Sequence, residues 1–564
     1  MTVSFKEDKN ADRPINSARP LRVVCVGAGI SGILIGIELP KLIPNLELII
    51  LDKNEEIGGT WFENRYPGVA CDVPAHAYQL SFESNPAWSH YYATGAEILR
   101  YWKAVAAKYG IDQYLRLGRE VREARWHDGV RQWLVEVHNK FSGRAELIAA
   151  DVLIMAEGEL NRWSWPDIEG LKDFKGSLVH SAAWPESFDH KGKRVAVIGA
   201  GSTGIQIVPA MQPDVAQLYH YIRGRNWVSP RFSDGQLRAR AGDAENCAFS
   251  RDEVKQWLND PELYLDFRKA IEQETQADFR LAFSNTPLQH ATTARLEKVM
   301  RERLAARPEL ADRLIPSFPP LCKRLTPGPG FLESLSAPNV EPVFDPITRV
   351  VPKGIVTEDD TLREVDAIVC ATGFDTDFRH RLPVFGAGAR SLHDKWADFP
   401  SSYLGVTVDE FPNFFVMLGP NSTQGAGSLL IQLEHSARYV AQCVKKLSVG
   451  NVETMTPKPA AVEKFVQFGE KWFKNTVFGA GCSSWYKSGP QGRVAALWPG
   501  SSLHCIEALK TPRFEDFDYT YVDNDEFGWF GNGFSEKDLD QDADKSYYIT
   551  PNMIDVERLL LKAE

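Results

Sequence analysis

The chain has 564 residues, 43% of them hydrophobic, and a net charge of −11 at pH 7. This length and composition predict a globular protein of two or three domains, and the negative charge disfavours nucleic acid as a partner. No run approaches the ~18 apolar residues of a membrane-spanning helix, and the N-terminus lacks the apolar stretch of a secretory signal. We therefore expect no integral membrane segment and a cytoplasmic location.

Eight cysteines are scattered along the chain without any C-x-x-C pair: Cys25, Cys71, Cys247, Cys322, Cys370, Cys443, Cys482 and Cys505. This spacing disfavours both a structural zinc site and a redox-active dithiol. We expect no metal site, and we expect reduced, mostly buried thiols.

The first recognisable unit is a strand, a glycine turn and a helix. A β-branched apolar run leads into Gly27, Gly29 and Gly32, and the next strand, residues 46–51, ends at Asp52. Such glycines let backbone N–H groups approach a pyrophosphate at the positive end of a helix, and a following acid can accept hydrogen bonds from ribose hydroxyls. The alternative, a glycine-rich turn without a ligand, is disfavoured by this context.

An aromatic and glycine-rich segment, EEIGGTWFENRYPGVACD, follows from Glu55 to Asp72. Two adjacent glycines let the backbone pass close to a flat or bulky group. The residues of this segment, which include Trp61 and Asp72, are unusual for a loop that only connects two elements. Loops of this composition are nevertheless often structural.

Further along, residues 94–110 predict an amphipathic helix and residues 119–154 a run of short strands. The segment Phe174–Pro185, FKGSLVHSAAWP, has an irregular spacing of Gly, His and Trp. This spacing predicts a shaped loop and not a core element.

The strand, glycine turn and helix then recur, with Gly199, Gly201 and Gly204 in the turn. Arg223 stands after the next strand, where Asp52 stands in the first unit. An arginine there can bind a 2′-phosphate, which a carboxylate would repel, so this site is predicted to take NADP(H). Arg225 could share this role, and a solvated surface arginine is the alternative reading of Arg223.

The remaining segments complete the prediction of the fold. Residues 232–315 are polar and helical in character, and a Pro- and Gly-rich loop surrounds Lys323 and Arg324. A buried strand that leads into Ala371 is expected to complete the first sheet. A helix follows the glycine-rich segment GPNSTQGAG, and its N-terminus could also face a ligand.

The negative charge is concentrated near the C-terminus. Residues 514–544 hold eleven acidic residues and one lysine, interleaved with eight aromatic ones. Because such aromatic density is atypical of a disordered acidic tail, we expect this extension to pack over the body of the protein.

One nucleotide-binding fingerprint is followed by an acid that can bind ribose, and the other by an arginine that can bind a 2′-phosphate. Together they predict FAD and NADPH in one chain. The fold class is therefore α/β, with two Rossmann-like dinucleotide-binding domains. We assign residues 1–165 and 366–510 to a discontinuous FAD-binding domain, 166–365 to an NADP-binding domain with a helical insertion at about 232–315, and 511–564 to the extension. Because no cysteine pair is predicted to accept electrons from the flavin, molecular oxygen is the expected acceptor.

At this point the sequence resembles the Baeyer-Villiger monooxygenases, which are class B flavoproteins. FKGSLVHSAAWP matches the family fingerprint at Phe174, Gly176, His180, Trp184 and Pro185, and GTWFENRYPGVACD matches a second family signature. CKRLTPGPGFLE is similar to the segment that carries the catalytic arginine of the family. The sequence departs from the usual A-T-G between the domains, where it has Ala156, Glu157 and Gly158.

The resemblance implies an NADPH- and O2-dependent oxidation of a small-molecule ketone to an ester or lactone through a peroxyflavin. Arg324 and Asp72 would be catalytic, with Asp72 orienting the guanidinium, and Lys323 would contact the 2′-phosphate of NADPH. The residues expected to contact the cofactors are Gly27, Gly29, Gly32, Asp52, Gly59, Thr60, Trp61, Asp72, Gly199, Gly201, Ser202, Thr203, Gly204, Arg223, Lys323 and Arg324.

Phe174, Gly176, His180 and Trp184 are expected to couple the two domains. His180 is interpreted as a hydrogen-bonded structural residue, because no proton transfer of the implied reaction requires it. Two alternative functions stay open at this point. One is a sulfur- or nitrogen-oxygenating flavin monooxygenase, and the other is a non-catalytic FAD-binding protein.

Overall fold

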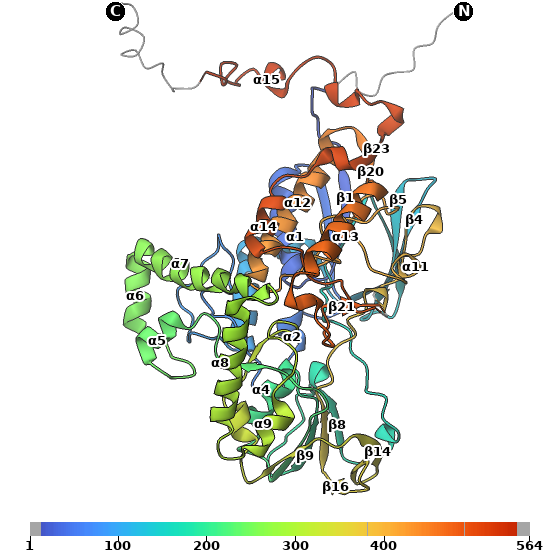
Figure 1. Ribbon diagram of the computed structural model, residues 1–564. Coiled ribbons are helices and arrows are strands. Elements are labelled where there is room, and N and C mark those ends of the chain that lie inside the picture. The colour runs from blue at the N-terminus through green and yellow to red at the C-terminus, as the bar shows by residue number, and fades with distance from the viewer. Residues whose placement is uncertain (1–12, 381, 490, 550–564) are drawn as a thin grey trace, which may run out of the picture.

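The computed structural model describes residues 13–549 apart from residues 381 and 490. Two parallel sheets of five strands each organise the chain. In Figure 1 the first sheet lies in the upper half of the molecule, with β1, and the second lies in the lower half, with β8 and β9. The predicted α/β class with two Rossmann-like sheets is confirmed.

The first sheet consists of short apolar strands, as is typical of parallel strands buried on both faces. Their order across the sheet is β19 (Phe414–Val416), β7 (Val152–Met155), β1 (Leu21–Val26), β2 (Leu46–Leu51) and β3 (Leu115–Arg116). One face packs on helices α1 (Ile30–Leu42), α3 (Gly95–Lys108) and α12 (Leu429–Val449). The other face packs on an antiparallel sheet of β4 (Arg119–His127), β5 (Gln132–Asn139) and β6 (Ala145–Ala150), with β18 (Val384–Phe385) beside β4.

The second sheet repeats this layered plan. Its order is β13 (Val340–Val343), β10 (Gln217–Tyr221), β9 (Arg194–Ile198), β17 (Ala367–Cys370) and β8 (Ser177–His180). One face packs on helices that include α4 (Ser202–Met211), α8 (Pro287–Arg303) and α10 (Phe331–Ser334). The other face packs on β14 (Ile347–Val351) and β15 (Gly354–Thr357), and β16 (Leu362–Glu364) pairs with β15. In both sheets, successive side chains of a strand therefore enter different cores.

The second sheet corrects the expectation about the strand before Ala371. This strand, β17, lies between β9 and β8, and β19 instead forms the edge of the first sheet. The predicted domain boundary at residue 366 therefore assigns a strand of the second sheet to the wrong domain. An apolar strand buried on both faces suits either parallel sheet, so its composition could not decide between them.

The segment Phe174–Pro185 also differs from its prediction, because it contains the edge strand β8 and is not only a shaped loop. A Cβ at Gly176 would lie 2.4 Å from the carbonyl oxygen of Asp366. Glycine therefore lets the chain approach the segment that precedes β17, with which β8 pairs in parallel.

The stretch predicted as a helical insertion contains α5 (Gly235–Ala241), α6 (Arg251–Asn259), α7 (Pro261–Ala277), α8 and α9 (Glu309–Leu314). In Figure 1, α5, α6 and α7 project to the left of α4, whereas α9 lies below it. Helix α6 begins with a capping box formed by Ser250 and Glu253. Within the described residues, no helix is both long enough and apolar enough to cross a bilayer.

The C-terminal part adds β20 (Val452–Pro457), α13 (Pro459–Phe473), α14 (Ser502–Ala508), β23 (Phe517–Tyr521) and α15 (Glu536–Leu539). Strand β23 pairs with β20, and Phe517 is buried against the first core. Beyond β23, Phe527 and Phe530 are 72% and 54% exposed, and the chain leaves the body toward α15 (Figure 1). The prediction that the whole extension packs on the body is therefore wrong for its later part, because acidic residues between the rings leave no continuous apolar face. Residues 550–564 lie outside the described residues.

Candidate active site

The turn between β1 and α1 has the geometry of a phosphate-binding loop. Gly27 has a φ of +112°, and a Cβ there would lie 2.4 Å from the carbonyl oxygen of Ala156. A Cβ at Gly32 would lie 1.9 Å from the carbonyl oxygen of Gly27. Helix α1 has no side-chain cap at Gly29 and no acidic residue in its first turn. Its first N–H groups can therefore bind an anion, and the loop fits the pyrophosphate of FAD.

Asp52 lies beside this turn at the end of β2 and is 7% exposed. Its Oδ2 accepts a hydrogen bond from the N–H of Ala28 at 2.7 Å, and its Oδ1 accepts one from the N–H of Asn54 at 2.8 Å. Burial raises the pKa of this carboxyl group, and the two backbone hydrogen bonds oppose that shift. A carboxylate has further lone pairs, so Asp52 can also accept ribose hydroxyls, and this contact stays a prediction.

The GGTWF segment packs directly on the first glycine turn. A Cβ at Gly59 would lie 3.0 Å from the Cα of Gly29. Thr60 and Trp61 begin the short helix α2 (Thr60–Glu63), and the buried Trp61 donates from Nε1 to the hydroxyl of Tyr78 at 3.3 Å. The residues predicted around the flavin are thus contiguous in space.

The turn between β9 and α4 repeats the first one closely. Gly199 also has a φ of +112°, and a Cβ at Gly204 would lie 2.0 Å from the carbonyl oxygen of Gly199. A Cβ at Gly201 would meet no atom within 4 Å, and α4 has no side-chain cap. Ser202 contacts the hydroxyl of Thr326 at 2.8 Å, and the hydroxyl of Tyr66 donates to the Oε1 of Gln206 in α4 at 2.8 Å. Open space above uncapped N–H groups fits a second pyrophosphate.

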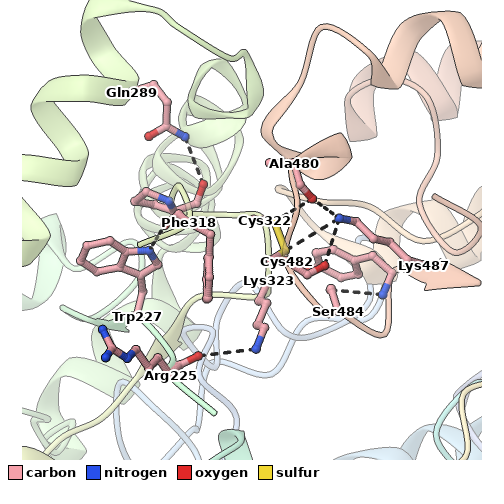
Figure 2. Close-up of a disulfide and its surroundings, with 12 residues drawn as sticks. Arg225, Trp227, Gln289, Phe318, Cys322, Lys323, Ala480, Cys482, Ser484 and Lys487 are labelled. Atoms are coloured by element: carbon pink, nitrogen blue, oxygen red, sulfur yellow. Dashed lines mark hydrogen bonds between the residues drawn. A yellow bond between two sulfur atoms is a disulfide. The ribbon is translucent and has the colours of Figure 1, made fainter. Parts of the chain in front are cut away.

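Three cationic side chains gather beyond this second turn. Burial and the charge of Arg223 lower the pKa of Lys323, so the two cations lie within electrostatic reach of each other. The Nζ of Lys323 is 3.5 Å from the carbonyl oxygen of Arg225 (Figure 2). The guanidinium of Arg225 donates to the carbonyl oxygen of Ile315 at 3.0 Å. No carboxylate among the described residues forms an ion pair with any of the three. Uncompensated cations at this position fit a 2′-phosphate.

Arg324 and Asp72 meet although 252 residues separate them in the sequence. The Nη2 of Arg324 donates to both carboxylate oxygens of Asp72, at 2.7 and 2.8 Å. The charge of Asp72 raises the pKa of Arg324, although desolvation opposes the shift. The Arg324 side chain is nevertheless 41% exposed, so a fixed guanidinium remains open to a ligand.

Sequence reasoning missed Tyr486, which lies near this ion pair. Burial raises the pKa of Tyr486 to about 12, and the charge of Arg324 opposes the shift, whereas Asp72 and Glu159 add to it. Glu159 accepts a hydrogen bond from the hydroxyl of Thr423 at 2.6 Å. The aromatic pair in the glycine-rich segment GAGCSSWYKSGPQG was the available signal for Tyr486, because its composition resembles that of the predicted loops.

The chain is similar to known proteins along most of its length. The model of an NAD(P)-binding Rossmann-like domain matches residues 25–94. The chain is 38% identical over 545 residues to the FAD-binding monooxygenase tazF of Aspergillus terreus, which covers 96% of each chain. It is 34% identical to the FAD-binding monooxygenase stcW of Emericella nidulans, over 95% of this chain and 88% of that one. The chain belongs to the FAD-binding monooxygenases.

Solved structures extend this assignment of the monooxygenase. Cyclohexanone monooxygenase from Rhodococcus sp. Phi1, bound to NADP+, matches with a TM-score of 0.77 and 28% identity, over 89% of this chain and all of that chain. A steroid monooxygenase bound to NADP matches with a TM-score of 0.75 and 27% identity, over 89% and 100% of the two chains. The resemblance to Baeyer-Villiger monooxygenases is confirmed, and the cofactors of this monooxygenase are FAD and NADP(H).

The fingerprint residues of the monooxygenase lie at the edge of the second sheet. His180 ends β8, is 1% exposed and stacks on Trp163 with ring centroids 4.3 Å apart. Its Nδ1 accepts from the N–H of Ala182 at 3.2 Å, so its Nε2 carries the proton and donates to the hydroxyl of Thr372 at 3.2 Å. Burial lowers the pKa of His180 to about 4. A neutral, fully bonded histidine supports the interpretation of His180 as a structural residue.

The other fingerprint residues have simpler surroundings. Phe174 is buried in the core between the second sheet and β14. Trp184 is half-buried and meets Phe188 edge to face at 5.3 Å. The role of these residues in coupling the two domains stays a prediction.

The prediction of reduced thiols is wrong for one pair of cysteines. Cys322 and Cys482 form a disulfide across 160 residues of sequence (Figure 2). The other six cysteines are free, and all of them except Cys247 are buried. A pair this far apart leaves no local spacing pattern, so sequence reasoning could not detect the bond.

Proposed function

We propose that this monooxygenase inserts one oxygen atom next to a ketone carbonyl and so forms an ester or a lactone, which is a Baeyer-Villiger oxidation. The observation that carries the proposal is the guanidinium of Arg324, which both oxygens of Asp72 hold, two residues before the Thr326 that contacts Ser202 of the second glycine turn. The solved relatives include a cyclohexanone monooxygenase and a steroid monooxygenase, which supports ketones as the substrate class.

Arg324 has the properties that the reaction requires of a catalytic cation. Its raised pKa keeps the guanidinium protonated at every pH of interest. A fixed cation can stabilise the negative charge that develops on the carbonyl oxygen of the ketone. Asp72 holds the Nη2 of the guanidinium through both of its oxygens, so that little reorganisation is needed when this charge appears. Bound FAD, once reduced by NADPH, supplies the activation of O2.

Other side chains limit access to this position. Tyr486 is 2% exposed and lies within electrostatic reach of Asp72 and Arg324. Trp61 is 9% exposed and donates to Tyr78, which also lies within electrostatic reach of Asp72. These buried rings shield one side of the Arg324 and Asp72 pair, and on that side the lower polarity strengthens the electrostatic effect of the guanidinium.

The test uses purified protein with FAD, NADPH and 18O2. Cyclic ketones of increasing ring size, an aryl ketone and a thioether are supplied separately, and the products are identified by mass spectrometry. We expect an ester or lactone that has gained one 18O atom from at least one ketone. Formation of sulfoxide alone would instead identify a sulfur-oxygenating monooxygenase, and a flavin that NADPH does not bleach would contradict a catalytic role.

A further inference from the structure

Two segments that are distant in sequence meet beside Arg324, and the Cys322–Cys482 disulfide joins them (Figure 2). Cys322 comes two residues before Arg324, and Cys482 comes four residues before Tyr486. The bond therefore lies close in the chain to both side chains that flank Asp72.

The segment on the Arg324 side is held in an unusual conformation. Leu321 has a φ of +69°, in the left-handed region that residues with a side chain rarely adopt. It is buried, as is Cys322, which is 0% exposed. The N–H of Cys322 donates to the carbonyl oxygen of Pro319 at 3.2 Å. A strained backbone persists only where its surroundings fix it, and the disulfide is a covalent constraint directly after Leu321.

The segment on the Tyr486 side is anchored at its other end to the body of the protein. The carbonyl oxygen of Tyr486 accepts from the N–H groups of Ala495 and Ala496 at 2.8 and 3.1 Å. The carbonyl oxygen of Ala495 in turn accepts from the N–H of Asn421 at 2.6 Å. The disulfide fixes the near end of this segment, so the position of Tyr486 depends on constraints at both ends.

We propose that the Cys322–Cys482 disulfide is a redox-responsive positioning link for the active site. In the oxidised state it holds Arg324 and Tyr486 in one arrangement, and in the reduced state the two segments separate and coupling of NADPH oxidation to oxygen transfer falls. The consequence for oxygen transfer rests on the proposed function, whereas the bond and its effect on the two segments do not.

The surroundings of the sulfur atoms suit both states. The Sγ of Cys322 is 3.5 Å from the carbonyl oxygen of Ala480, which can accept from a thiol once the disulfide is reduced. The Nζ of Lys487 is 3.9 Å from the Sγ of Cys482 and can stabilise a thiolate there. Lys487 also donates to the carbonyl oxygens of Ala480 and Cys482, so it stays beside this sulfur.

A dithiol can reduce the bond with all atoms and electrons balanced. One thiolate of the reductant attacks the Sγ of Cys482, which at 8% exposed is the more accessible cysteine, and Cys322 leaves as a thiolate that takes up a proton. The second thiolate of the reductant then attacks the mixed disulfide. This step releases the Cys482 thiolate, which is also protonated, and yields the cyclic disulfide of the reductant. Two electrons and two protons are transferred in total.

The existence of the link is tested first, by alkylating denatured protein without reduction and mapping its peptides by mass spectrometry. We expect a cross-linked Cys322–Cys482 peptide after treatment with oxidised glutathione and two alkylated peptides after treatment with dithiothreitol. Alkylation of both cysteines after oxidised glutathione would overturn the proposal, whatever reaction the enzyme catalyses.

The positioning effect is tested with Cys322→Ser and Cys482→Ser, and with Cys247→Ser as a control that removes a free thiol from the helical insertion. In both test variants we expect faster hydrogen exchange at residues 483–497, normal reduction of the flavin by NADPH, and product per NADPH lower by ~10-fold, since small displacements of catalytic groups have large kinetic effects. The control should match the wild type. Should a serine variant fold poorly, wild-type protein reduced with dithiothreitol provides the same comparison.

This experiment distinguishes a failure of the positioning role from a failure of the proposed function. Unchanged exchange at residues 483–497 in the reduced wild-type protein would overturn the positioning role. If no ketone is oxidised, the proposed function fails, but faster exchange and a change in peroxide release on reduction would still support the link.

Discussion

The two nucleotide sites are built from the same turn, but they differ in the residue that follows the second strand. In the first site, Asp52 is 7% exposed and both of its oxygens accept backbone N–H groups. In the second site, Arg223 is exposed and its charge lowers the pKa of Lys323. One site therefore contains a buried anion fixed by the fold, and the other contains cations that repel each other.

This difference teaches how the two cofactors are told apart. A buried carboxylate and a cluster of cations for which the described residues form no ion pair both cost free energy in the protein without its cofactors. Each cost is reduced only by the ligand that supplies the matching groups, which are ribose hydroxyls in the first site and a 2′-phosphate in the second. The predicted contacts of Asp52 with ribose and of Arg223 with the 2′-phosphate would make the selectivity of each site depend on one position at the end of a strand.

The largest effect is expected at Arg324, which lies outside both glycine turns. Arg324→Ala should lower product formation by ~10²–10³-fold, because it removes a fixed charge that stabilises developing negative charge. Reduction of the flavin by NADPH should continue, since both glycine turns stay intact. Stopped-flow absorbance and product analysis measure the two steps separately. Arg238→Ala, which removes an exposed arginine paired with Asp234, is the matched control. A variant that forms product at the wild-type rate would contradict the assignment of Arg324.

A smaller effect is expected when the cationic cluster of the second site is broken. Arg223→Ala should raise the KM for NADPH by ~10–100-fold and barely change the KM for NADH, because charge-assisted hydrogen bonds to the 2′-phosphate are lost. Equal changes for both cofactors would show that Arg223 does not contact this phosphate.

Arg223→Ala should also shift the pH dependence of the KM for NADPH. The charge of Arg223 contributes to the lowered pKa of Lys323, and only protonated Lys323 attracts the phosphate. The KM for NADPH therefore rises as the pH rises through the pKa of Lys323. In Arg223→Ala this rise should begin at a higher pH, which a series of KM measurements between pH 7 and 10 will detect.

The parts of the fold and site that the sequence predicts are those with local signals. The glycine turns, Asp52 and Arg223 all have fixed spacings, because the turn and the strand that follows it form one continuous unit. The family motifs likewise located Arg324 and Asp72, whose contact across 252 residues the structure then supplies.

The features that the sequence could not predict depend on contacts between segments that are distant in the chain. Strand β17 suits either parallel sheet, so its place between β9 and β8 follows only from the assembled fold. Tyr486 and the partner of Cys322 lie in a segment whose own sequence carries no spacing rule, and they reach the site by packing of Phe478 and Tyr486 in the second core. The exposed aromatic residues after β23 show that composition alone does not predict burial.

Substitution of Asp52 is expected to lower the affinity for FAD without lowering the unfolding temperature of the protein that lacks FAD. Asp52→Asn keeps the size of the side chain, but its amide has one acceptor oxygen where the carboxylate has two, so the variant loses one backbone N–H partner. It also weakens hydrogen bonds to ribose, so FAD affinity should fall by ~10-fold. Burial raises the pKa of Asp52 in the folded protein, so the ionised group disfavours folding at neutral pH, and this penalty disappears as the pH falls. The variant without FAD should therefore unfold at a temperature equal to or above that of the wild type at pH 8. A lower unfolding temperature would mean that the backbone hydrogen bonds of Asp52 outweigh its desolvation.

The smallest effect is expected at His180, and it is a change in acid stability. Burial lowers the pKa of His180 from 6.5 to about 4. Between these values the unfolded chain binds more protons than the folded one, so stability is lost as the pH falls through this window. His180→Gln keeps a donor for Thr372 and removes the titration, so its free energy of unfolding should fall less steeply from pH 6.5 to 4.5 in urea titrations.

A second buried histidine separates this stability effect from a role in coupling the domains. Burial lowers the pKa of His76 to about 3, and its Nδ1 contacts the hydroxyl of Tyr264 in the helical insertion at 2.9 Å. His76→Gln should therefore reduce the acid sensitivity as His180→Gln does. Only His180→Gln removes the ring that stacks on Trp163, so only this variant should lower the product formed per NADPH, by a few-fold. Equal coupling in the two variants would limit His180 to a structural role in the second sheet, and the two nucleotide sites would then depend on other contacts to act in sequence.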